Sequence, residues 1–375
     1  MADLRAGSPP PEVITVSLHD LQAGTIPLST LEKAFGPTSL GIILVRDLPP
    51  NYLSLRKTLL SYSSYLANLP PATLAEVEKP EAKYSTGWSC GKETLANGRY
   101  DTLKGSYYAQ PIHDVELEAK ARSLYPECVE MTSANVWPPE EVLPGFERVF
   151  EELCRLIVDT AALVARNCDR YGVAKLEGYA DGTLEKIVRT SVATKARLLH
   201  YFPPPPTAAA AEEEATRPDS ALALEDDWCA THLDLGALTG LTSQMFIDED
   251  LHPPFPPDGK KATDPITGLL LPLPELDNHP DPHTGLWIKS RTGLTTQIHI
   301  PRDCLAFQTG QTLELLTLGK FKAVPHFVRG AKPGQGGRIA RNTLAVFTQP
   351  NLWDVVDGEG RHFAELAGAI LSAGL

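Results

Sequence analysis

Apolar positions change their spacing near residue 196, and this change separates two parts of the chain. Between 144 and 171 they recur at intervals of three and four, which predicts one long amphipathic helix. Pro144 suits the first turn of this helix and Gly172 suits its end. After 196 the apolar residues come in short runs between turn residues, which favours a sandwich or barrel.

The same pattern predicts the other elements. Short strands are expected at 13–18 and 41–45, helices at 28–36 and 51–67, loops over 68–115, and a closing helix within 360–375. Later strands are expected at 197–202, 231–235, 241–247, 285–288, 297–301, 304–308, 313–316, 323–328 and 341–347. Proline-rich insertions at 203–227 and 249–284 are expected to supply little core. The predicted class is α+β, mainly β, as one structural unit with an N-terminal region over 1–120 and a catalytic core over 121–375.

Composition narrows the possible functions. The 34 Lys and Arg against 47 Asp and Glu give a net charge of −13, which argues against nucleic acid as a partner. No run of about 18 uncharged apolar residues is present, so no membrane span is expected. The first residues carry no hydrophobic stretch, and the six cysteines form no C-x-x-C pair, so a cytoplasmic monomer with free thiols is expected.

The candidate chemistry begins in the predicted strand that holds His232 and Asp234. Residues i and i+2 of a strand face the same side, so an imidazole and a carboxylate project together. With one more histidine they form the facial triad that holds non-haem Fe(II). A second H-x-D, His279-Pro280-Asp281, lies among prolines that block strand pairing, and a surface loop is the expected place for it.

The third ligand is expected from His299 or His326. His326 is preferred because an Arg-x-Thr, Arg341 to Thr343, follows on an apolar strand. These two side chains share a face, and a guanidinium beside a hydroxyl suits a buried carboxylate. A ligand between metal and arginine would connect both ends of the site.

The order of these motifs resembles the isopenicillin N synthase-like group of Fe(II)/2-oxoglutarate oxygenases. The resemblance extends to RLLHYFPPP, to CATHLDLGALTGL and to LAFQTGQTLELLTLGKFKAVPHFV, and it covers nearly the whole chain. KGSYYAQP and NVWP resemble segments of fungal clavaminate synthase-like members. The chain departs from the family at Gln311, where Asp is usual, at Phe327, where Arg is usual, and at Thr343, where Ser is usual.

The resemblance implies a double-stranded β-helix, or jelly roll, with the N-terminal helical region packed on it. It implies Fe(II) on His232, Asp234 and His326, with 2-oxoglutarate held at its far carboxylate by Arg341 and Thr343. A tyrosine often completes this pocket, and Tyr201 or His200 could do so. With O₂, such an enzyme oxidises a C–H bond of a small metabolite by hydroxylation, desaturation or ring closure. An amino-acid-derived acid is the expected substrate class.

Four residues, Trp88, Arg99, Tyr107 and Tyr108, lie where relatives carry substrate-covering loops, so they are candidate substrate contacts. The alternative is that these aromatic rings pack the loop onto the barrel. Two other functions stay open. One is an oxidase of the isopenicillin N synthase type, in which Arg341 and Thr343 hold the substrate's own carboxylate without 2-oxoglutarate. The other is a non-catalytic metal-binding protein that retains the fold.

Overall fold

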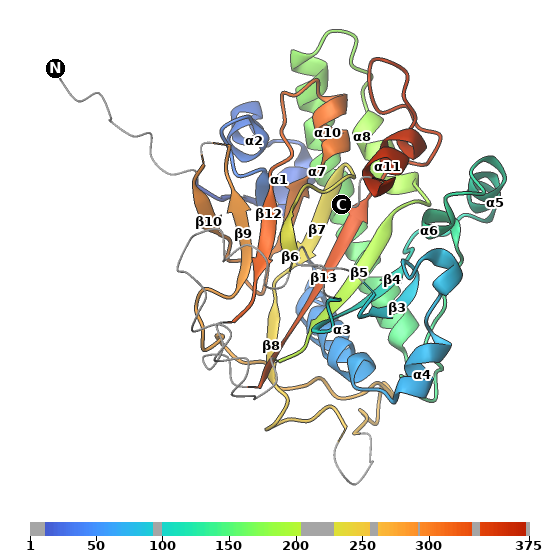
Figure 1. The fold of residues 1–375 in the computed structure, drawn as a ribbon. Coiled ribbons are helices and arrows are strands. Elements are labelled where there is room, and N and C mark those ends of the chain that lie inside the picture. Colours follow the sequence, from blue (N-terminus) through green and yellow to red (C-terminus); the bar gives the residue numbers. More distant parts are fainter. Residues whose placement is uncertain are drawn as a thin grey trace, which may run out of the picture.

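The computed structural model describes residues 12–92, 100–203, 229–255, 262–291, 293–331 and 338–372. Within them, two β-sheets face each other and helices cover the outer face of the larger sheet (Figure 1). The larger sheet has nine strands in the order β1-β2-β11-β7-β13-β5-β4-β3, with β8 also paired to β13. The smaller sheet has the order β10-β9-β12-β6. Most of the 203–227 insertion lies outside the described residues.

The strands have the following bounds. They are β1 (Ile14–Ser17), β2 (Ile42–Arg46), β3 (Gly87–Cys90), β4 (Lys104–Ala109), β5 (Lys195–Tyr201), β6 (Cys229–His232), β7 (Leu238–Thr242), β8 (Met245–Asp248), β9 (Gly285–Lys289), β10 (Thr295–Gln297), β11 (Leu305–Thr309), β12 (His326–Arg329) and β13 (Ile339–Thr348). All neighbours pair antiparallel except β1 and β2, which are parallel.

The helices lie mainly before the smaller sheet in the sequence. They are α1 (Leu18–Ala23), α2 (Leu28–Phe35), α3 (Tyr52–Ala67), α4 (Pro71–Glu76), the 3-10 turn η1 (Pro80–Ala82), α5 (Val115–Leu124), α6 (Val129–Thr132), α7 (Phe146–Lys175), α8 (Thr183–Thr190), α10 (Gln311–Leu316) and α11 (Phe363–Ser372). Among the described residues, no helix is both long enough and apolar enough to cross a bilayer.

Strand β2 shows why its sequence is apolar on both faces. Ile43 and Val45 pack with the helices, whereas Ile42 and Leu44 pack between the two sheets with residues such as Ile288. A strand covered on both faces needs a continuous apolar run rather than alternation. The prediction that this strand is fully buried is therefore confirmed.

The long helix α7 packs along the large sheet, and the predicted helix over 144–171 is confirmed with shifted ends. It begins at Phe146 after Gly145, and it continues past Gly172 to Lys175. The prediction that Gly172 ends the helix is wrong. A Cβ at Gly172 would lie 2.7 Å from the ring of Tyr179, so this glycine permits close packing instead.

Two short apolar regions differ from their predicted structure. Residues 313–316 belong to helix α10 rather than to a strand, since a short, mainly apolar run alone does not distinguish the two. The single strand expected over 241–247 is broken into β7 and β8. The region 68–115, expected to be loops, also contributes β3 and β4 to the large sheet beside β5.

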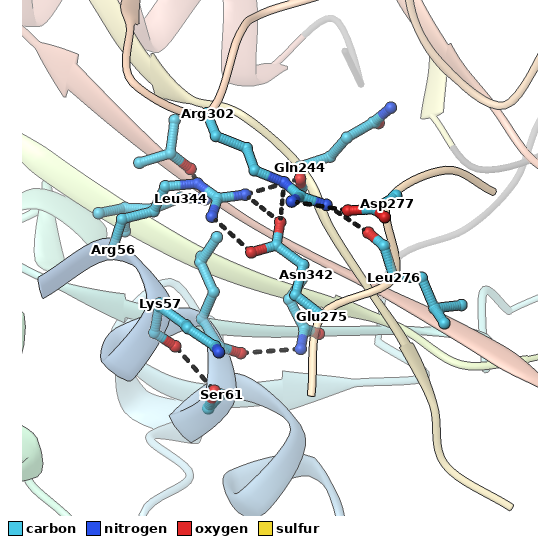
Figure 2. A network of polar contacts seen from close by, with 12 residues as sticks. Arg56, Lys57, Ser61, Gln244, Glu275, Leu276, Asp277, Arg302, Asn342 and Leu344 are labelled. Carbon is cyan, nitrogen blue, oxygen red and sulfur yellow. Dashed lines mark hydrogen bonds and ion pairs between the residues drawn. The ribbon is translucent and has the colours of Figure 1, made fainter. Parts of the chain in front are cut away.

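The 249–284 insertion supplies more core than expected. Leu270 and Leu273 are buried in the main hydrophobic cluster. Glu275 forms a two-pronged ion pair with the buried Arg56 of α3, at 2.8 and 3.0 Å (Figure 2). A carboxylate and a guanidinium are buried here because each satisfies the other. The insertion is thus fixed against the helical layer.

Successive side chains of β13 and β5 point alternately into a cavity between the two sheets and toward the helices. Arg341, Thr343 and Tyr201 face the space between the sheets. Leu344 and Asn342 face the other way, and the Asn342 amide donates to the Leu60 carbonyl and the Ser64 hydroxyl of α3. Since strand side chains alternate, Arg341, Thr343 and Tyr201 lie together on one wall.

Candidate active site

Three potential metal ligands meet at the end of the smaller sheet. His232 ends β6 and pairs directly with His326 of the neighbouring β12. Asp234 follows two residues later, and its Oδ1 lies 3.7 Å from the Nε2 of each histidine. One ligand atom from each of the three lies within 4.8 Å of the others. This spacing suits a shared divalent ion.

Asp234 reaches the site through a turn rather than through the strand pleat expected from the sequence. Strand β6 ends at His232, and the Asp234 carbonyl accepts the N–H of Gln311 at 2.8 Å. A Cβ at Gly310 would overlap the carbonyl oxygen of Gly236, so only glycine fits against this turn. Backbone contacts therefore hold the carboxylate in place.

Hydrogen bonds at Nδ1 orient both imidazoles. His232 Nδ1 lies 2.8 Å from the Ala230 carbonyl, so the proton sits there and Nε2 faces Asp234. His326 Nδ1 lies 3.3 Å from the Val324 carbonyl and 2.6 Å from the side-chain amide of Gln308. The oxygen and nitrogen of a glutamine amide are assigned from their hydrogen-bond partners. Gln308 can therefore turn its Oε1 toward the Nδ1–H of His326 and accept a hydrogen bond from it. Such partners direct the Nε2 atoms of both rings toward the position of a metal.

Burial and neighbouring charges shift the two histidines of the triad in opposite directions. Burial lowers the pKa of His326 to about 4, although Asp234 opposes this. Burial acts in the same sense on His232, but Cys229 and Asp234 outweigh it and raise its pKa to about 9. Among the described residues, the buried Oδ2 of Asp234 has no hydrogen-bond partner. A buried carboxylate oxygen without a partner is costly, and a divalent ion would satisfy it.

A cavity of about 730 Å³, including its open mouth, lies beside the triad between the sheets. Its wall carries two arginines among mostly apolar side chains. The lining residues are Arg197, Leu199, Tyr201, Cys229, His232, Asp234, Thr239, Leu241, Thr242, Gln244, Leu286, Ile298, Ile300, His326, Val328, Arg341, Thr343, Ala345 and Phe347.

Arg341 is the buried cation at one end of this cavity, with 4% of its surface exposed. Its Nε donates to the Gln244 side-chain oxygen at 2.8 Å, and its guanidinium lies 4.8 Å from the centre of the Tyr201 ring. Thr343 lines the same wall. His200 turns to the opposite face and its Nδ1 contacts Asn342 at 2.8 Å, so Tyr201 is the one of the two that lines the cavity.

The other histidines lie away from the triad. His299 is exposed, while its neighbours Ile298 and Ile300 line the cavity. The prediction of a surface loop for His279 and Asp281 is wrong, because both residues are buried. His279 Nδ1 accepts the Asp281 N–H at 2.9 Å, which gives this H-x-D a turn-forming role.

The candidate substrate residues lie in different places. Tyr107 is fully buried among α7 side chains and its hydroxyl donates to the Val136 carbonyl, and Trp88 packs over Gly105. Neither lines the cavity among the described residues. The Tyr108 ring lies 5.0 Å from the guanidinium of Arg197, which does line it. Arg99 lies outside the described residues.

Sequence reasoning missed three polar residues at the site. Gln308 contacts the distal histidine, Gln244 contacts Arg341, and Arg197 gives the cavity a second cation. Alternation within the predicted strand at 197–202 places Arg197 on the face of Tyr201, so this residue could have been found. The two glutamines carry no comparable pattern.

Comparisons with known proteins agree on the fold. No family model and no curated protein matches this sequence. A Neurospora crassa protein solved in complex with α-ketoglutarate matches over 98% of both chains at 17% identity, with a TM-score of 0.64. A Caulobacter crescentus protein ascribed to the 2OG-Fe(II) oxygenase family matches over 96% of this chain and 98% of its own, at 18% identity and TM-score 0.63. A rice dioxygenase for auxin oxidation matches over 97% of this chain and 96% of its own, at 13% identity and with a TM-score of 0.56. The chain therefore has the fold of 2-oxoglutarate/Fe(II) oxygenases.

Proposed function

We propose that this chain is a non-haem Fe(II)- and 2-oxoglutarate-dependent oxygenase that oxidises a C–H bond of a small molecule, and that its sheets form a double-stranded β-helix. The observation that carries the proposal is the His232–Asp234–His326 triad beside a cavity whose far end holds the buried Arg341. Two imidazoles and one carboxylate form the donor set typical of non-haem Fe(II) enzymes, with positions left open.

Each residue has a distinct task in this proposal. Fe(II) bound there would supply the oxidising chemistry, in which O₂ is used to decarboxylate 2-oxoglutarate to succinate. His232, Asp234 and His326 hold the ion in one orientation, because Ala230, Gln308 and the turn at Gly310 restrain them. Arg341, Thr343 and Tyr201 receive the far carboxylate of 2-oxoglutarate. The apolar wall excludes water from the reacting centre.

The substrate is expected to be a small molecule with at least one polar or anionic group. Arg197 lines the cavity on the Tyr108 side, held by the Ser106 hydroxyl at 2.9 and 3.0 Å. The similar Neurospora crassa protein has been crystallised with thymine and with 5-formyluracil. An amino-acid-derived acid stays the predicted class, and membership of the isopenicillin N synthase-like group stays a prediction.

The decisive experiment is incubation of the purified chain with 2-oxoglutarate, O₂ and a metabolite pool, with and without Fe(II). Succinate release that requires Fe(II), with a substrate product seen by mass spectrometry, is expected. O₂ consumption without 2-oxoglutarate would instead favour the oxidase. Metal uptake without consumption of O₂ or 2-oxoglutarate would favour the non-catalytic metal-binding alternative. The monomeric state, the cytoplasmic location and the regions 1–120 and 121–375 stay predictions.

A further inference from the structure

Gln244 lies where the strand opposite β13 is interrupted. Between the pairs Ala345–Leu241 and Asn342–Met245, β13 advances by three residues and the opposite strand by four. One extra residue is therefore inserted, as in a β-bulge, which redirects side chains and is frequent beside active sites. The interruption frees the Gln244 carbonyl from the ladder and allows its side chain to reach the cavity.

Gln244 is hydrogen-bonded to two arginines, one at its side chain and one at its main chain. Its side-chain oxygen accepts a hydrogen bond from the Nε–H of Arg341 at 2.8 Å, and its main-chain oxygen accepts one from Nη2 of Arg56 at 2.8 Å. Arg56 is 1% exposed and is held in turn by both oxygens of Glu275 (Figure 2). Arg302 also contacts Glu275, at 3.1 Å. A continuous set of charged hydrogen bonds thus runs from the 249–284 insertion to the cavity wall.

The backbone at Gly285 packs directly against the Gln244 side chain. Gly285 has a φ of +128°, and a Cβ there would lie 2.7 Å from the Gln244 side-chain oxygen. A glycine is required both for this conformation and for this approach. The side chain is therefore enclosed between Gly285 and Arg341.

We infer that Gln244 is a positioning residue that fixes the Arg341 guanidinium for the far carboxylate of 2-oxoglutarate, and that Arg56 and Glu275 hold Gln244 in place for this task. The inference rests on the proposed function. With Nε bound to Gln244 and one face against Tyr201, the guanidinium has a single orientation. A prearranged donor loses less entropy when it binds a ligand.

The test compares two 2-oxoacids on the full-length chain loaded with Fe(II) under anaerobic conditions. 2-Oxoglutarate carries the far carboxylate, and 2-oxobutyrate lacks it. Gln244→Met keeps the length of the side chain and removes the acceptor. The Kd of 2-oxoglutarate, measured by calorimetry, is expected to rise about tenfold, and that of 2-oxobutyrate to change less than about twofold. A structural defect would weaken both ligands equally.

The control is Gln22→Met, the same substitution at an exposed glutamine of α1 that does not line the cavity. It should change neither Kd. Unchanged 2-oxoglutarate binding in folded Gln244→Met, or an equal loss for both acids, would overturn the inference. If this variant does not fold, Glu275→Gln replaces it, since weakening the Arg56 contact should produce the same selective loss. Failure of the wild-type chain to bind 2-oxoglutarate would instead reject the proposed function.

Discussion

The two ends of the cavity balance their charges in opposite ways. At the triad, Asp234 has a buried oxygen without a partner among the described residues, and 35% of the His232 side chain is exposed. At the other end, Arg341 is 4% exposed and already bound by Gln244. The carboxylate of the triad thus needs a cation as its partner, whereas the protein itself orients the arginine through Gln244.

The two ends of the cavity therefore depend on different interactions for their stability. A cation brings binding free energy that offsets the repulsion and desolvation of the triad, so that end depends on the ion. The arginine end depends on buried hydrogen bonds and ion pairs that form during folding. Variants at the triad should therefore affect metal binding, and variants near Arg56 should affect folding.

The largest effect is expected from His326→Ala. Free energies of about 10–16 kcal/mol for four-ligand zinc sites put one ligand at roughly 2.5–4 kcal/mol. Metal affinity should therefore fall about a hundredfold to a thousandfold, and turnover should be lost. His232→Ala should behave in the same way. Metal content by mass spectrometry and the Kd for Fe(II) under anaerobic conditions measure the change.

The matched control for this prediction is His299→Ala. His299 is exposed and lies two residues from the end of β10, so iron should stay bound. Loss of iron in His299→Ala together with retention in His326→Ala would reject the assignment of the distal ligand.

The next effect is on stability. Glu275→Ala leaves the guanidinium of Arg56 buried without its carboxylate, which should lower the free energy of unfolding by about 3 kcal/mol. Urea denaturation measures this. Asp250→Asn removes a half-exposed pair with Arg338 and should cost less than about 1 kcal/mol. Equal losses in the two variants would show that burial does not distinguish these pairs.

A smaller effect, selective for the cosubstrate, is expected from Arg341→Met. Removal of a charged, two-pronged hydrogen bond should raise the KM for 2-oxoglutarate roughly tenfold to a hundredfold and leave the Kd for the metal unchanged. Succinate formation at several 2-oxoglutarate concentrations measures the KM. The exposed Arg189→Met on α8 provides the control. An unchanged cosubstrate dependence in Arg341→Met would favour the oxidase or another anchor.

Residues close in sequence explain what could be predicted. Arg341 and Thr343 alternate with Asn342 and Leu344, so the two-residue period of β13 places both anchor residues on the cavity face. For the triad, the sequence offered two H-x-D motifs and two further histidines. The order of the motifs along the chain, with Arg341 and Thr343 after His326, was enough to choose among them. The long amphipathic helix α7 could also be predicted, because its apolar residues recur at intervals of three and four.

Residues far apart in sequence explain what could not. Arg56 and Glu275 are 219 positions apart, and nothing in either neighbourhood indicates the other. The bulge at Gln244 depends on the register of two strands, which apolar spacing does not define. The short run at 313–316 fits a helix or a strand equally well, and its packing decided the outcome.

The smallest effect concerns protons at the triad. His232 has a pKa of about 9 and is protonated at neutral pH, whereas His326, at about 4, is already neutral. A metal needs the Nε2 lone pair, so binding near pH 7 should release about one proton and affinity should rise with pH until about 9. Calorimetry in two buffers of different ionisation enthalpy counts this proton. Cys229→Ala removes a neighbour that raises the pKa of His232, and it should reduce the number released. Equal heats in both buffers for the wild-type chain would contradict this account, because the triad would then already be deprotonated without its cation.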